Sequence, residues 1–131
     1  MAWADVETIL GETLTAHFGN DITGWVTRLP ANDIRPHMPL LVVTRFGGGY
    51  DGLAIDEAAV DVDVYASSQE GAKALAGRAV LYLTGLRNHT ADGHVLTRVQ
   101  VMTSPIRRPY DSKQQVHRYG AALRVSVHVK R

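Results

Sequence analysis

Residues 57–86, EAAVDVDVYASSQEGAKALAGRAVLYLTGL, contain two different periodicities in one unbroken stretch. In the first part the pattern alternates with a period of two, which is typical of a half-buried strand. One predicted face holds Val60, Val62, Val64 and Ala66, and the other holds Asp61, Asp63 and Tyr65. Ser67 and Glu70 then have the spacing of a capping box. A helical stripe rich in alanine follows, so the stretch predicts a strand that runs into a helix packed on a sheet.

The residues before this stretch predict a helix and two further strands. From Asp5 to Phe18 the apolar residues have helical spacing, and Gly19 follows as a plausible C-cap. We expect a short strand over Trp25–Leu29 and a loop bracketed by the prolines at 30, 36 and 39. Leu40–Phe46 is apolar and β-branched, as in a buried strand. The glycines at 47–49 and 52 predict a flexible hairpin tip after it.

The residues after the stretch predict a turn, two strands and a polar arm. Arg87–Gly93 is rich in turn-forming residues, and Val95–Met102 alternates as a strand does. Ser104–Gln115 contains two prolines and is expected to be a polar loop or arm, and Arg118–Lys130 alternates again. The predicted order is α-β-β-β-α-β-β. This order indicates an α+β fold of two layers, in which a mixed or antiparallel sheet of four to five strands carries two helices on one face.

The length and composition predict one domain that fills residues 1–131. The chain has a mass of 14.3 kDa, 45% hydrophobic residues and no cysteine. A core of this size needs neither disulfides nor metal, and cysteine-based zinc sites and nucleophiles are excluded. The N-terminus lacks the basic start and apolar run of a signal peptide. We therefore expect a soluble protein without a membrane partner.

The net charge of +1 conceals a division between the two halves of the chain. Residues 1–66 have a net charge of −7, and residues 67–131 have a net charge of +8. Such asymmetry can indicate a nucleic-acid partner, or surfaces that meet each other in an assembly. If the acidic strand face and the arginine-rich arm lay on opposite flanks, successive copies could join head to tail and close into a ring.

The motifs that could support catalysis are weak. The glycines at 47–49 lack the lysine and the following helix of a phosphate-binding loop. Asp61 and Asp63 point the same way, as metal-binding carboxylates of nucleases do, but a solvated or subunit-facing strand is several times more common. The six histidines show no ligand spacing, and no serine nucleophile motif is present. The expectation is a protein that is not an enzyme and has no catalytic residue, cofactor or metal.

Nucleic-acid binding remains as an alternative explanation of the basic half. One segment mixes basic and aromatic side chains that could contact phosphates. These residues are Arg107, Arg108, Tyr110, Lys113 and Arg118. The sequence pI of about 8.1 is nevertheless below that of a dedicated DNA-binding domain. Arginine and tyrosine are also enriched in protein interfaces.

Four segments together resemble the tail terminator, or tail-completion, proteins of long-tailed bacteriophages. They are the N-terminal helix, LLVVTRFGGGYDG after a proline, AAVDVDVYASSQEGAKALA, and SPIRRPYDSKQQVHRYGAALRVSVHVKR. The resemblance covers the chain from about Val6 to Val129. Related minor proteins of the phage neck share this size and layout.

The resemblance implies a structural protein of the virion tail or neck, assembled in the cytoplasm of the bacterial host. Members of that family form homohexameric rings that cap the tail tube, stop its polymerisation and present a surface for joining the head. The implied partners are further copies of the chain, the tail tube protein and a head-completion or connector protein, with DNA passing only transiently through the lumen. The candidate subunit or tube contacts are Gly48, Asp61, Asp63, Arg107, Arg108, Tyr110, Asp111 and Arg118. The alternatives are a small nucleic-acid-binding module, another neck connector and, remotely, a metal-dependent nuclease.

Overall fold

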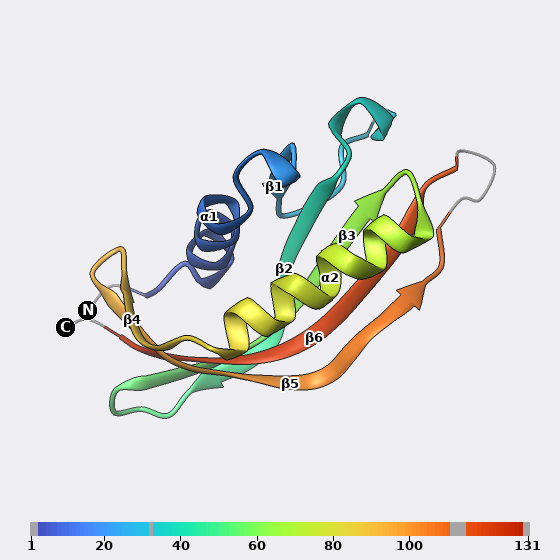
Figure 1. The fold of residues 1–131 in the computed structure, drawn as a ribbon. Coiled ribbons are helices and arrows are strands. Elements are labelled where there is room, and N and C mark those ends of the chain that lie inside the picture. Colours follow the sequence, from blue (N-terminus) through green and yellow to red (C-terminus); the bar gives the residue numbers. More distant parts are fainter. Residues whose placement is uncertain (1–2, 32, 111–114, 130–131) are drawn as a thin grey trace.

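A six-stranded mixed sheet with two helices on one face forms the structure (Figure 1). The computed structural model describes residues 3–31, 33–110 and 115–129. The strand order is β1-β2-β3-β6-β5-β4, and β1 pairs with β2 in parallel while all the other neighbours are antiparallel. The predicted α+β class is confirmed, with one strand more than expected.

Each α-helix is followed by a run of three strands, and each α-helix is capped at its start by a polar side chain. In chain order the elements are α1 (Val6–Phe18), the 3-10 turn η1 (Gly19–Asp21), β1 (Gly24–Val26), η2 (Arg35–His37), β2 (Leu40–Tyr50), β3 (Ile55–Ala66), α2 (Gln69–Thr84), β4 (Arg87–Ala91), β5 (His94–Arg108) and β6 (His117–His128). Asp5 caps α1 by accepting a hydrogen bond from the Thr8 amide. The N-cap of α2 is Ser68, which accepts from the Gly71 amide, so the predicted capping box at Ser67 and Glu70 is wrong by one residue.

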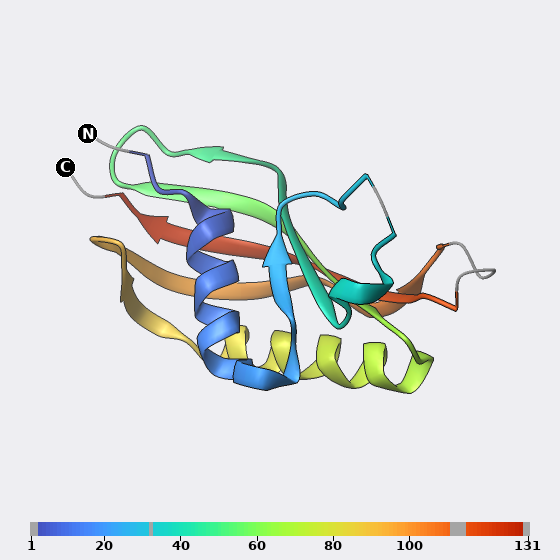
Figure 2. The same cartoon turned by 90° about the horizontal axis from the view of Figure 1, so that it is seen from above.

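The main core lies between the sheet and the two helices. α2 runs alongside the strands and packs on β3, β5 and β6, whereas α1 crosses them and packs on β1 and β2 (Figure 2). Val60, Val62 and Val64 point into this core, as their alternation predicts. His17 of α1 stacks on Tyr82 of α2 with ring centres 3.8 Å apart. The two helices therefore form one layer.

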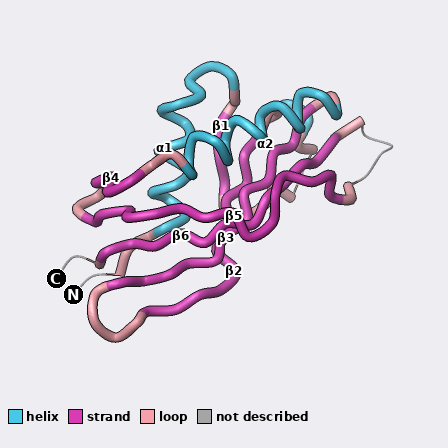
Figure 3. Tube along the Cα trace, turned by 60° about the horizontal axis from the view of Figure 1, so that its bottom comes forward, coloured by secondary structure: helices cyan, strands magenta, loops and turns pink. Residues whose placement is uncertain are grey.

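Both α-helices lie on one face of the sheet, and neither α1 nor α2 covers the other face (Figure 3). At one end it carries a second, smaller core, in which the β1–β2 connection buries Ile34 against Leu40, Val42 and Tyr65. Leu40–Val43 is buried on both sides for this reason, as expected of a continuous apolar run. Elsewhere this face, which we call the open face, carries the side chains of β3, β5 and β6 that alternate with the core residues.

Three predictions about connections are wrong. The glycines at 47–49 are paired residues of β2, and the β2–β3 turn is formed by residues 51–54. Arg87–Ala91, predicted as a turn, is the strand β4. The first five residues of the predicted polar arm, 104–108, belong to β5.

Candidate interaction surface

Four of the candidate residues form one ion-pair network on the open face. Asp63 Oδ1 accepts a hydrogen bond from Arg108 Nη1 at 2.9 Å, and its Oδ2 accepts one from Arg118 Nη2 at 3.1 Å. Asp61 Oδ1 lies 3.2 Å from the same Arg108 nitrogen. The side chain of Asp63 is only 6% exposed, so this carboxylate is the buried counter-ion of two arginines.

The network compensates the repulsion between two arginines that the strand register places side by side. Arg108 of β5 and Arg118 of β6 are direct cross-strand partners. Like charges in such positions are destabilising. The register also places Asp63 of β3 beside β6, opposite Gly120, from where its carboxylate reaches both guanidinium groups. The acids of β3 therefore hold the two arginines in place.

Gly120 is the residue that makes room for this network. A Cβ atom at this position would overlap the Asp63 carboxylate and would lie 2.9 Å from Arg108 Nη1. No local pattern marks Gly120, because the residues that surround it come from strands far away in the sequence. Its importance could not be inferred before the register of β3, β6 and β5 was known.

Two tyrosines extend the network toward the smaller core. Tyr65 is buried and packs against Tyr110 in an edge-to-face arrangement, with ring centres 5.2 Å apart. The guanidinium of Arg118 lies over the Tyr65 ring at 5.6 Å from its centre. Burial raises the pKa of Tyr65 to about 12, although the nearby Arg118 acts in the opposite direction. For Arg118, burial alone would lower the pKa, but the hydrogen bond and charge of Asp63 outweigh it and raise the pKa above its ordinary value.

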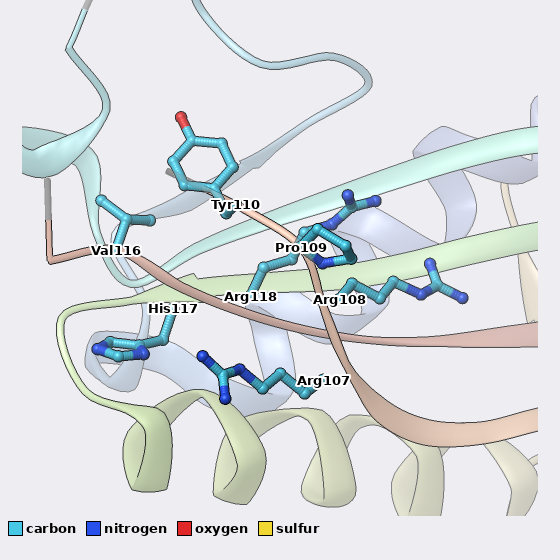
Figure 4. Close-up of a pocket in the computed structure, with 7 residues that line it drawn as sticks. All are labelled: Arg107, Arg108, Pro109, Tyr110, Val116, His117 and Arg118. Atoms are coloured by element: carbon cyan, nitrogen blue, oxygen red, sulfur yellow. The ribbon is translucent and has the colours of Figure 1, made fainter. Parts of the chain in front are cut away.

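A cavity of about 340 Å³ opens beside the network, where β5 ends and β6 begins. Its lining residues are Arg107, Arg108, Pro109, Tyr110, Val116, His117 and Arg118 (Figure 4). Arg107 is exposed and makes no ion pair with any other described residue. Arg118 Nε is enclosed and makes no hydrogen bond with another described atom. The cavity therefore offers the positive charge of Arg107 next to an apolar wall, whereas Arg118 Nε is closed off from it.

Gly48 lies away from this cluster, in the far half of β2. Its φ of +92° and its position beside the β3 backbone both require glycine, since a Cβ would overlap the Glu57 carbonyl oxygen. A register shift between Arg45 and Gly47 precedes it. Gly48 lines a second, shallow cavity of about 420 Å³ on the open face, together with Gly49, Glu57, Ala58, Ala59, Met102 and Arg124.

The structure thus brings Asp61, Asp63, Arg108, Tyr110 and Arg118 together, with Arg107 beside them, and leaves Gly48 apart. Asp111 lies outside the described residues. The acids and arginines are neighbours in one molecule and do not lie on opposite flanks. The head-to-tail contact expected from those two flanks therefore loses its basis, because Asp61 and Asp63 already pair with arginines of their own chain.

The described residues contain no group of three or more histidine, aspartate or glutamate side chains placed to hold a metal ion. Asp61 and Asp63, the pair that a nuclease would use, contact guanidinium groups instead. Neither helix in the described part of the chain has the length and apolar character needed to cross a membrane.

Comparison with solved structures shows what this fold is similar to. No family model and no curated protein matches the sequence. A chain from the structure titled "Virion of native gene transfer agent (GTA) particle" matches with a TM-score of 0.62 and 14% sequence identity. The alignment covers 95% of this chain and 95% of that one. The architecture from α1 to β6 is therefore similar to that of a chain in a gene transfer agent virion.

Proposed function

We propose that this chain is a structural protein of a phage-like virion, without catalytic activity, that assembles into a homohexameric ring. The ring caps the tail tube in the neck of the particle, prevents further tube subunits from adding and presents a surface to a head-completion or connector protein. The particle assembles in the cytoplasm of the bacterial host, and DNA contacts the ring only while it passes through the lumen.

The observation that carries this proposal is the likeness to a chain of the gene transfer agent virion over almost the full length of both chains. The strand and helix pattern that resembles tail terminators agrees with it. The described residues also offer exposed apolar side chains of the kind that a partner covers, among them Phe46, Met102 and Ile106. Ring formation is the part of the proposal that needs a direct test.

The candidate contacts divide into two roles under this proposal. Arg107 and Tyr110 are accessible at the cavity beside β5, and Gly48 shapes the second cavity on the open face. Asp61, Asp63, Arg108 and Arg118 hold the first of these surfaces rigid through their ion pairs. Asp111 follows Tyr110 in sequence and stays a candidate contact.

Electron microscopy of the purified protein and a tube-growth assay test the proposal together. We expect ring-shaped particles with six-fold symmetry, and we expect tubes of the cognate tail tube protein to stop growing when the ring is added. Tubes of unchanged length distribution would contradict the terminator role. A ring found next to the head in assembled particles, rather than on the tube, would instead indicate a neck connector.

The structure gives less support to a nucleic-acid-binding module than the sequence did. Two of the four basic residues in that hypothesis, Arg108 and Arg118, are neutralised by Asp61 and Asp63. Tight binding of duplex DNA by a monomer, with a steep dependence on salt, would favour this alternative.

A further inference from the structure

The sheet has a length of unpaired edge on each of its two sides. On one side β1 pairs only with residues 40–42 of β2, so no described strand lies beyond residues 46–50 of β2. On the other side β4 pairs with β5 only as far as Arg98, which leaves residues 99–108 as the outer edge of the described sheet. A strand edge carries unpaired backbone donors and acceptors, so each edge can receive another strand.

Both edges also carry large apolar side chains that are exposed. Phe46 of β2 is 54% exposed, and Leu53 in the turn after it is exposed as well. On β5, Val101, Met102 and Ile106 are each at least 42% exposed. Natural proteins protect edges that face only water with charges or coverage. Exposed apolar side chains on an uncovered edge therefore indicate a surface that a partner covers.

The charges beside the two edges are opposite in sign. β5 contains no acidic residue, and its exposed charges are Arg98 and Arg107. The edge of β2 ends at the exposed Asp51, and the exposed Glu57 pairs with Gly49 across the β2–β3 hairpin. Two β5 edges would therefore repel each other, as would two β2 edges, whereas a β2 edge and a β5 edge attract. This pattern favours a heterologous contact between copies, which can close into a ring.

The strand directions suit such a contact. β2, β3, β6 and β5 are neighbours in that order, and each pair is antiparallel, so β2 and β5 run in opposite directions. When a second copy stands beside the first in the same orientation, its β5 is antiparallel to the β2 that it meets. Pro105 has no amide to donate, so side-chain packing supports the backbone hydrogen bonds at that point.

The edges lie toward opposite ends of the sheet, which sets how far neighbouring copies are displaced. The β2–β3 turn is at the end that holds both termini, and β5 ends toward the other end (Figure 1). The register places Gly48 level with Val99, at the start of the free part of β5. Matching the middles of the edges needs a shift of about 15 Å along the strands, across a width of about 19 Å for four strands. Strands inclined at about 40° to the ring axis supply this shift, an inclination usual in closed sheets.

We infer that residues 46–50 of β2 in one copy pair with the free part of β5 in the next copy, so that the sheets of neighbouring copies become continuous. Phe46 then packs against Met102 and Ile106 of the next copy, and the acids beside β2 lie near the arginines of β5. This inference rests on the proposed ring and assigns the edges that meet within it.

Cysteine cross-linking tests which edges meet, because the chain has no cysteine of its own. With Phe46→Cys and Ile106→Cys in one chain, a short bismaleimide should link neighbouring copies into a ladder that ends at the hexamer on a denaturing gel. Either substitution alone should give only the monomer on the gel. Phe46→Cys with Leu81→Cys is the matched control and should give no ladder, because Leu81 is exposed on α2 and lies on neither edge.

Two outcomes would overturn the inference while leaving the proposed ring intact. One is a doubly substituted chain that forms rings by sedimentation velocity but gives no covalent ladder. The other is a covalent dimer from Ile106→Cys alone, which would mean that two β5 edges meet. A wild-type chain that is monomeric would instead remove the proposed function itself, and the inference with it.

Ile106→Lys tests the β5 edge without a cross-linker. A charge on this apolar edge should weaken association about ten-fold or more. Leu81→Lys places the same charge on an exposed leucine outside both edges and should leave association unchanged. Sedimentation velocity over a range of protein concentrations measures association, and circular dichroism verifies that each variant is folded. Ile106→Lys rings as stable as those of the wild type would overturn the inference. If such rings no longer stopped tube growth, the edge would bind the tail tube protein instead.

Discussion

Gly120 shows how one missing side chain allows a charged network to form. Its Cα faces Asp63 across the β3–β6 pair, and a methyl group there would occupy the space of the Asp63 carboxylate. We expect Gly120→Ala to destabilise the protein by about 1–3 kcal/mol, the usual cost of overpacking. Chemical denaturation measures this change.

Gly47→Ala is the control for that substitution. Gly47 is also a strand glycine with ordinary φ, and a Cβ there would have only the Ala59 methyl nearby, at 3.9 Å. Its effect should lie within about 1 kcal/mol of zero. Equal effects of the two substitutions would mean that the packing around Asp63 is not special.

The two acids of β3 should contribute very differently to stability. Asp63 is nearly buried and pairs with two arginines, so Asp63→Asn should cost about 3 kcal/mol by leaving both charges without their counter-ion. Asp61 is 32% exposed and makes one longer contact, so Asp61→Asn should cost less than about 1 kcal/mol. Denaturation of both variants checks the ranking, and a reversed order would contradict the assignment of Asp63 as the central counter-ion.

The buried phenol of Tyr65 should make the protein less stable in alkaline solution. Burial raises its pKa from 10 to about 12 in the folded protein, so the folded state favours the neutral phenol. The resulting stabilisation is complete below pH 10 and is lost as the pH rises toward 12. The free energy of unfolding should therefore fall more steeply over this range in the wild type than in Tyr65→Phe. Parallel curves would show that the phenol does not contribute.

At the scale of elements, the contact between α1 and β1 depends on a glycine in the helix. A Cβ at Gly11 would overlap the Trp25 ring of β1, although alanine is the better helix former. Gly11→Ala should therefore destabilise the protein by about 1–3 kcal/mol, with a change in tryptophan fluorescence. Gly77→Ala in α2, where a Cβ meets nothing within 4 Å, should instead stabilise it by about 0.5–1 kcal/mol. Two changes of the same sign would contradict this account.

The elements with a clear apolar period can be predicted from the sequence, and those defined by pairing cannot. β3, α2 and β6 are predictable because one face of each is buried in a single core. β4 is not, because RNHTA is polar and Asn88 has a positive φ, so only its pairing with β5 defines it as a strand. The end of β5 has the pattern of a loop because it contains Pro105. Proline is tolerated there because β4 pairs only with the start of β5 and leaves this part at the sheet edge.

The site can be predicted only in part, for a related reason. The alternation in β3 correctly places Asp61 and Asp63 on one face, away from the core. Their partners Arg108 and Arg118 lie 45–55 residues away, and the register that joins them depends on bulges in β5. The sequence therefore identifies the charged residues but does not show that they neutralise one another.

At the scale of the whole molecule, the division of charge between the two halves has two consequences. Part of this charge is neutralised within the chain, where acids of the first half form ion pairs with arginines of the second half. Examples are Asp21–Arg78 and Asp63–Arg118. The remainder is exposed on the described surface and includes the acids Glu12, Glu57 and Asp92 and the bases Arg98, Arg107 and Arg124. Under the proposed function, these exposed charges are available for contacts between subunits.

The mass of the protein in solution tests the proposed ring most directly. Sedimentation velocity, or light scattering behind a sizing column, should show one discrete species of six times 14.3 kDa at micromolar concentration. This species should dissociate as the salt concentration rises, because charged contacts steer its assembly. A chain that sediments as a 14.3 kDa monomer at every concentration and salt condition would contradict the account.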